Sequence, residues 1–110
     1  RDEDVEFAAD VPSQPQIPQN RLFQNRPNPF NPETIIPYSV AAKGKVTIGI
    51  YDISGRCIRT LVDAVKDPGI YQTRWTGELD SGGKAASSIY FYRITYPDGA
   101  SLAKKMALLR

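Results

Sequence analysis

Few residues of this chain could take part in chemistry, and no catalytic combination is visible among them. The sequence has no histidine, so the usual general base near neutral pH is missing and nothing activates the thiol of the lone cysteine, Cys57. Carboxylates beyond residue 20 fall mostly at turns, where capping of backbone groups is their common role. None of the constellations that enzymes require is present, and we expect a non-catalytic protein without a cofactor.

The glycine-rich stretch GELDSGG, residues 77–83, is the segment that comes nearest to a metal site. Glu78, Asp80 and loop carbonyls would offer the hard oxygen ligands that Ca²⁺ prefers. The spacing does not match the loop of an EF-hand. The sequence therefore predicts no metal site, with these two carboxylates as the only weak candidates.

Aromatic side chains offer a second possible chemistry, the stacking of sugar rings or bases. Trp75, Tyr90, Tyr92 and Tyr96 could form such a platform. A thin β domain also needs a bulky side chain at its centre, which favours core packing for Trp75. The basic residues are scattered and not grouped in a run, so they indicate a solvated surface, and we expect no nucleic-acid partner.

Charge and composition divide the chain near residue 20. Residues 1–19 hold one base and five acids, a net charge of −4, which leaves +6 for residues 20–110 of a total of +2. Within the first part, VPSQPQIPQN carries prolines at intervals that favour an extended linker. We read residues 1–19 as an acidic, then proline-rich linker from an upstream domain, and residues 20–110 as one folded domain.

The first residues, RDEDVEF, lack an initiator methionine, a basic segment and an apolar segment of the kind found in signal peptides. We therefore expect the chain to be the C-terminal part of a longer protein whose targeting signal lies upstream. No stretch approaches 18 apolar residues, so no transmembrane segment is predicted.

Beyond residue 20, short apolar runs alternate with turn signals, and no helical periodicity of useful length occurs. Seven short strands separated in this way are typical of a small immunoglobulin-like antiparallel β-sandwich, here without a disulfide because the chain has one cysteine. Cys57 is expected to pack as a small hydrophobe. The predicted strands are residues 34–40, 45–53, 57–62, 71–75, 85–86, 89–96 and 101–110.

Two of these strands carry specific predictions. Pro37 removes a backbone donor, which favours an edge position for residues 34–40. The run IYFYRITY, residues 89–96, is apolar or aromatic on both faces, which favours a central strand covered on both sides.

The stretch RPNPFNPET, residues 26–34, precedes the first predicted strand and carries three prolines. Each proline lacks an N–H and pushes the residue before it towards extended or turn conformations. Asn28 and Asn31 can bond local backbone groups. We expect a stiff segment that presents Phe30 inward as a plug at the end of the sandwich.

From Leu22 to Arg110 the chain resembles the type A C-terminal sorting domain of the bacterial type IX secretion system, whose fold is similar to the immunoglobulin-like domain of the flagellar hook-capping protein. Four blocks carry the resemblance: QNRPNPFNPETIIPYSV, VTIGIYDISGRCIRTLV, GIYQTRWTGELDSGGKAASSIYFYRI and the terminal KKMALLR. Arg26, Thr76, Ser88 and Tyr71 depart from the residues common in the family. The signature residues that match are Pro27, Asn28, Pro29, Phe30, Asn31, Pro32, Tyr51, Asp52, Gly55, Arg56, Trp75, Gly77, Tyr90, Phe91 and Tyr92.

The resemblance implies a delivery function. Proteins with such a domain reach the periplasm, cross the outer membrane because a translocon recognises the terminal module, and reach the cell surface or the medium, where a sortase typically removes the module. The cleaved bond would lie within residues 1–20. The residues expected to meet the translocon are Lys104, Lys105, Met106, Leu108, Leu109 and Arg110.

Two alternatives stay open from the sequence. The terminal run can be an ordinary last strand whose lysines guard an edge. The whole domain can also be an immunoglobulin- or fibronectin-like accessory module that stabilises or orients a neighbouring catalytic domain and buries an apolar patch against it.

Overall fold

A computed structural model describes residues 19–110. The linker and the cleavage segment predicted for residues 1–18 lie outside these described residues. No helix of the described part is long and apolar enough to cross a membrane.

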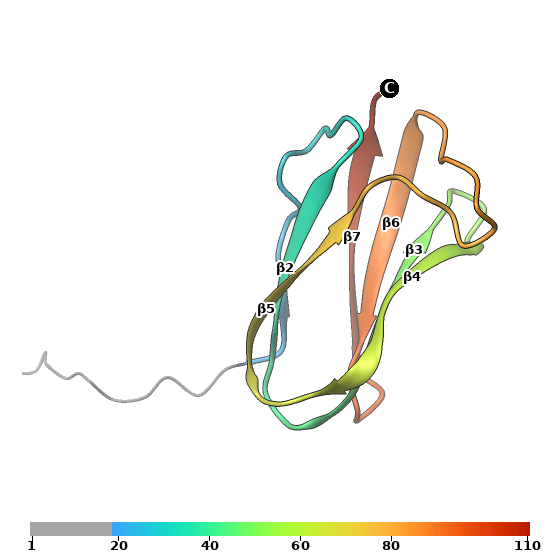
Figure 1. The fold of residues 1–110 in the computed structure, drawn as a ribbon. Helices are drawn as coiled ribbons and strands as arrows, with labels where there is room; N and C mark the ends of the chain where they lie inside the picture. Colours follow the sequence, from blue (N-terminus) through green and yellow to red (C-terminus); the bar gives the residue numbers. More distant parts are fainter. Residues whose placement is uncertain (1–18) are drawn as a thin grey trace, which may run out of the picture.

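Seven antiparallel strands form two sheets packed face to face (Figure 1). The three-stranded sheet has the order β1-β2-β5 and the four-stranded sheet the order β4-β3-β6-β7. The strands are β1 (Arg21–Leu22), β2 (Thr34–Val40), β3 (Gly44–Tyr51), β4 (Cys57–Lys66), β5 (Gly69–Trp75), β6 (Ser88–Thr95) and β7 (Ser101–Leu108).

Period-two alternation of side chains builds the core between the sheets. Every second residue of β2 and β3 points inward, and these apolar side chains are fully buried. Trp75 at the end of β5 is 1% exposed, which confirms its expected core position. Inward residues that are at most 1% exposed include Ile36, Tyr38, Val40, Val46, Ile48 and Ile50.

The strand count agrees with the sequence prediction, but one strand differs. Residues 85–86 form no strand; Ala85 is buried, and its N–H donates to the carbonyl of Gly77 at 2.7 Å inside the loop. The count of seven is instead completed by β1, a strand that the sequence analysis did not predict; its two residues pair with Tyr38 and Ser39 of β2. Two residues are too few to show a period in a sequence.

Pro37 lies in the middle strand of its sheet, so the predicted edge position is wrong. Its carbonyl accepts the N–H of Phe23 at 3.1 Å, so the side of Pro37 that lacks a donor faces the β1 side of the sheet. β1 ends one residue before this point, and the pairing of β2 with β5 continues through Pro37 and Gln72. The missing donor therefore costs no bond between β2 and β5.

β6 is a central strand, as predicted, between β3 and β7. The prediction that both faces of β6 are covered is wrong. Tyr90, Tyr92 and Ile94 are buried, while Ile89 and Phe91 are 39% and 38% exposed. The inner face packs against the other sheet, and no described element covers the outer face. Cys57, expected to be packed, is also exposed.

Candidate functional site

The terminal strand is paired along both of its edges over its second half. One edge of β7 pairs with the whole of β6. At the other edge, Phe30 N–H donates to the Ala107 carbonyl at 3.0 Å, and Leu109 N–H donates to the Phe30 carbonyl at 2.9 Å. The first and last blocks of the sequence therefore meet here.

The side chains of Asn28, in the proline-rich segment, and of Gln24, just before it, extend this contact. The Asn28 Oδ1 accepts the Ala107 N–H at 3.0 Å, and Gln24 Nε2 donates to the Lys105 carbonyl at 3.0 Å. These bonds occupy backbone groups that an edge strand would otherwise offer to another chain. Within the described residues, the outer edge of β7 is thus bonded at the Lys105 carbonyl and at both backbone groups of Ala107.

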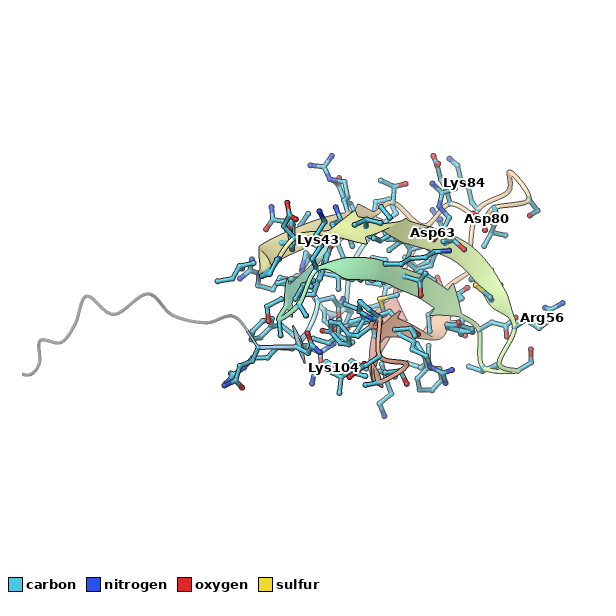
Figure 2. All side chains as sticks on the ribbon, turned by 90° about the horizontal axis from the view of Figure 1, so that it is seen from below. Lys43, Arg56, Asp63, Asp80, Lys84 and Lys104 are labelled. Carbon is cyan, nitrogen blue, oxygen red and sulfur yellow. The ribbon has the colours of Figure 1, made fainter. Side chains whose placement is uncertain are left out.

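The six residues predicted to meet a translocon divide into accessible and buried groups. Met106 and Leu108 are 1% and 0% exposed, so in the folded domain they hold the core and do not reach a partner. Lys105 and Arg110 are exposed, and Leu109 is 55% exposed. Lys104 is half-buried and lies on the opposite side of the molecule from Asp80 and Lys84 (Figure 2).

Arg110 is bound to the loop between β5 and β6. Its Nε donates to the Ala85 carbonyl, its Nη2 donates to the Gly77 carbonyl at 3.3 Å, and its N–H donates to Ser87 Oγ at 2.8 Å. The chain end therefore lies against residues 77–87. No sequence signal predicts these contacts, because the partners are 23 to 33 positions away.

The proline-rich segment is held by a buried polar cluster that the sequence analysis missed. Asn25 is 2% exposed; its N–H donates to the Tyr92 hydroxyl at 2.9 Å and its Nδ2 to Thr34 Oγ1 at 3.0 Å. The Tyr92 hydroxyl donates to the Phe23 carbonyl at 2.7 Å. Burial raises the pKa of Tyr92 to about 12, so the hydroxyl stays protonated and can donate.

Phe30 is 1% exposed and packs on Trp75, as the sequence analysis expected of an inward plug. The ring of Trp75 also meets Tyr90 edge-on, with centroids 5.5 Å apart, and its Nε1 donates to the Glu78 carbonyl at 2.9 Å. The aromatic residues proposed as a stacking platform are therefore core residues: Trp75, Tyr90, Tyr92 and Tyr96 are each at most 5% exposed.

The tight turn between β3 and β4 is organised by Asp52. Its Oδ1 accepts the Ser54 hydroxyl at 2.6 Å and the Arg56 N–H at 3.0 Å, and its Oδ2 lies 3.1 Å from Arg56 Nη2. The Ser54 hydroxyl and then the Arg56 groups hold the pKa of Asp52 at about 2. Gly55 supplies the φ of +89° that the turn needs.

The two carboxylates considered for calcium are not brought together as a ligand set. Asp80 Oδ2 accepts the Thr60 N–H at 3.1 Å and its Oδ1 lies 3.7 Å from Arg59 Nη1, so it bonds to the outer edge of β4. Within residues 19–110 no cluster of three or more His, Cys, Asp or Glu side chains occurs.

The site as a whole is an accessible chain end, formed by Lys105, Leu109 and Arg110, on a terminal strand that the proline-rich segment holds in place. It presents two positive side chains and one apolar side chain, which suits recognition by a protein partner through charge and shape.

Comparison with solved structures relates this fold to components of a secretion system. The crystal structure of dimeric latent PorU from Porphyromonas gingivalis matches 87% of this chain with a TM-score of 0.65 and 21% sequence identity. PorZ of the same organism, an essential surface component of the type IX secretion system, matches 81% with a TM-score of 0.55 and 20% identity. The chain spans about a tenth of either protein, 10% of PorU and 11% of PorZ.

At these identities the likeness concerns the fold, a small β-sandwich similar to regions of PorU and PorZ. No protein-family model matches the chain, and no curated protein does.

Proposed function

We propose that this chain is a non-catalytic C-terminal sorting domain that directs an upstream cargo protein through the bacterial type IX secretion system to the cell surface or the medium. The observation that carries the proposal is the junction between Phe30 and β7. The proline-rich block and the terminal block, which are the two ends of the family resemblance, bond to each other there.

This junction gives each block a role in recognition. The proline-rich segment, together with Gln24 just before it, bonds to the outer edge of β7 from the Lys105 carbonyl onwards and thereby fixes the direction in which the last residues leave the sandwich. A partner would then meet a preorganised chain end, which lowers the entropy lost on binding. The likeness of the fold to regions of PorU and PorZ supports the same system.

In this proposal the outer-membrane translocon is the first partner and a cell-surface sortase the second. The accessible residues Lys105, Leu109 and Arg110 would carry the contact, while Met106 and Leu108 keep the strand seated in the core.

The experiment is a secreted fusion. A reporter with a signal peptide followed by residues 1–110 is expressed in a bacterium with a type IX system, beside the same reporter without the domain. The proposal expects the first to leave the periplasm and the second to stay there. Retention of both would contradict it.

The rival function is an accessory module attached to a neighbouring domain, and one observation favours it. Ile53, Ile89 and Phe91 are exposed, and Phe91 and Ile89 lie on the outer face of the four-stranded sheet, where a neighbouring domain would cover them. Mass spectrometry of the exported protein separates the two functions, because a sorting domain is cleaved off and an accessory module is kept.

A further inference from the structure

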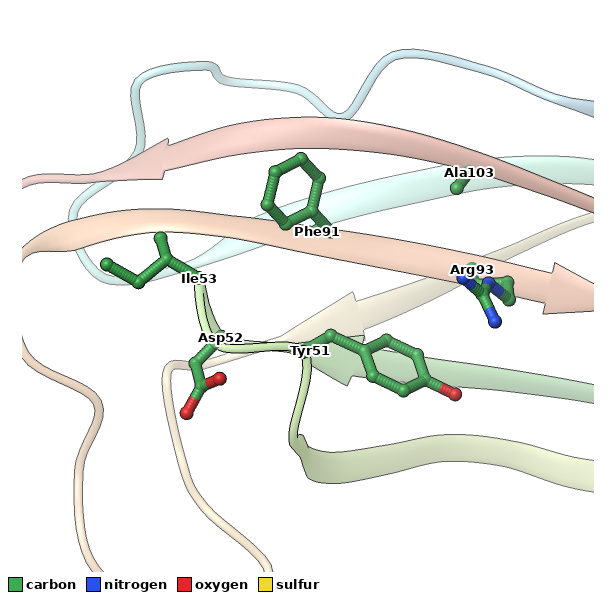
Figure 3. A pocket seen from close by; sticks show the side chains of 7 residues that line it. Tyr51, Asp52, Ile53, Phe91, Arg93 and Ala103 are labelled. Atoms are coloured by element: carbon green, nitrogen blue, oxygen red, sulfur yellow. The ribbon is translucent and has the colours of Figure 1, made fainter.

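The outer face of the four-stranded sheet carries a hollow that the sorting function does not use. Its volume is about 220 Å³. Phe91 and Arg93 of β6, Ala103 of β7, and residues of the β3–β4 turn surround it (Figure 3). The sequence analysis expected this face to be covered, and the described residues leave it open.

Cross-strand register explains how the hollow forms. Tyr51, Phe91 and Lys105 are neighbours in one row across β3, β6 and β7, and Gly49, Arg93 and Ala103 form the next row. In the second row a single long side chain stands between two small ones, which leaves space beside it. The empty space beside Arg93 therefore follows from the small side chain of Ala103.

The space over Gly49 is taken by Tyr51. A Cβ at Gly49 would lie 3.2 Å from Tyr51 Cε1, so the tyrosine ring leans across the glycine. This brings the ring under the Arg93 guanidinium, which lies 5.3 Å from the ring centroid. The ring holds the guanidinium over its face by a cation–π contact and leaves its N–H donors available to a ligand.

The charge around the hollow is positive. Among residues 19–110 neither Arg93 nor Lys105 forms a salt bridge, whereas five of the acids there are each paired with another base. Asp52, the acid among the residues that line the hollow, is engaged by Ser54 and Arg56, and Figure 3 shows its carboxylate directed away from Arg93. The face thus combines an apolar wall with unpaired positive charge.

Apolar exposure completes the pattern. Phe91 is 38% exposed and Ile53 is 74% exposed, and both line the hollow. Exposed aromatic and branched side chains beside available cations are typical of a surface that meets a partner.

We propose that this face, defined by Tyr51, Ile53, Phe91, Arg93 and Ala103, is a docking site for an extended acidic segment of a partner protein. An aromatic or branched side chain of that segment fills the hollow against Phe91, and a carboxylate of the segment binds Arg93. The inference does not rest on the sorting function, because it concerns a different face from the chain end.

The geometry fixes the spacing of the ligand. The two rows lie two residues apart along each strand, about 7 Å at 3.3 Å per residue. Residues i and i+2 of an extended peptide are separated by the same distance and point to the same side. The ligand therefore carries a carboxylate two positions from the apolar side chain, which matches the step from the Phe91 row to the Arg93 row.

Fluorescence polarisation of labelled peptides with the complete chain tests this. The probe is GESFSEG, in which both glutamates share a side with the phenylalanine, so that one of them faces Arg93 in either chain direction. GSEFESG has the same composition but places the glutamates on the opposite side, and GESSSEG lacks the aromatic ring. The proposal expects both controls to bind at least fivefold more weakly, and equal binding of GSEFESG would overturn it.

Protein variants separate the docking site from general charge attraction. We expect Arg93→Glu to weaken binding of the probe about tenfold. Ala103→Trp should weaken binding by a similar factor because the indole fills the hollow, and it leaves the net charge unchanged. Arg21→Glu changes the net charge equally on the other sheet and is expected to leave binding within twofold. A loss with Arg21→Glu as large as that with Arg93→Glu would contradict the proposal.

Folding and a competing occupant are controlled in the same series. The mutated residues are exposed, so thermal midpoints should stay close to that of the parent chain, and amide NMR shifts caused by the probe should be centred on Phe91 and Arg93.

If neutralising the acids of residues 1–10 by Asn and Gln substitutions strengthens probe binding tenfold, the chain's own segment occupies the face and the partner proposal is wrong. Unchanged binding supports it.

Discussion

Phe30 and Trp75 pack with their ring centroids 5.7 Å apart and their planes at 56°. One ring comes from the proline-rich segment and the other from the end of β5, and the Phe30 backbone bonds to β7 at the same place. A single residue thus links both sheets to the chain end. The three prolines around it restrict the unfolded segment, so less entropy is lost when Phe30 is inserted.

Removal of this ring should destabilise the domain strongly. For Phe30→Ala we expect the free energy of unfolding to fall by about 3–5 kcal/mol, because the ring is fully buried. Phe23→Ala is the matched control. Because Phe23 is 40% exposed, this substitution should lower the free energy of unfolding by about 1 kcal/mol or less. Urea unfolding followed by Trp75 fluorescence measures both, and equal losses would mean that Phe30 has no special role.

Alkaline pH should destabilise the domain through Tyr92 and Tyr96. Burial raises the pKa of each to about 12, above the value of about 10 in the unfolded chain. The stabilisation is therefore complete below pH 10 and is lost as the pH rises from 10 to 12. Tyr92→Phe removes one of these groups. Between pH 10 and 12 the unfolding free energy of the variant should therefore fall less steeply than that of the parent, with the two slopes differing by about 1.4 kcal/mol per pH unit. Parallel slopes for the parent and the variant would contradict the assignment.

The pKa of the Asp52 carboxyl should lie well below that of an ordinary aspartate. Its pKa of about 2 lies under the unfolded value of about 3.9, so its contribution is present above pH 4 and is lost as the pH falls towards 2. Because the Ser54 hydroxyl is the first cause, Ser54→Ala should raise this pKa. Carbon-13 NMR titration of the Asp52 carboxyl measures both values. An unchanged pKa in the variant would assign the shift to Arg56 instead.

Arg110 should couple energetically to Gly77. Gly77 has a φ of +79°, and a Cβ there would lie 2.7 Å from Arg110 Nη2. We expect Gly77→Ala to cost about 1–2 kcal/mol from the backbone alone and more from the displaced guanidinium. In a background with Arg110→Ala the second part should disappear, which a double-mutant cycle of unfolding free energies detects. Gly82→Ala, with a φ of +100° and open space, should show no such coupling.

The sequence predicts the sandwich well because alternation is a local signal. The strand at residues 34–40 and the capping role of carboxylates at turns, such as Asp52, follow from spacing within a few residues, and the structure confirms them. The position of Pro37 could not be predicted, because it depends on which side of β2 the two-residue strand β1 pairs. The exposure of Cys57 likewise depends on which elements cover β4.

The candidate site is predictable only in part for the same reason. The terminal run identifies the strand and its lysines, but whether Met106 faces the core depends on the register of β7 against β6. The contact of Arg110 with Ala85 and the bond between Asn25 and Tyr92 join residues 25 and 67 positions apart. Such contacts leave no periodic pattern in a sequence.

Export of a fusion with a folded but altered chain end tests the central claim most directly. The variant Lys105→Glu with Leu109→Ser changes two exposed side chains, and Arg21→Glu with Ile70→Ser is the matched control on the other sheet. Fractionation of a type IX host into periplasm and medium measures the export of each reporter fusion, and circular dichroism of the purified domains checks their fold. The account predicts that the control is exported like the parent while the altered chain end stays in the periplasm. Normal export of the altered chain end would contradict it.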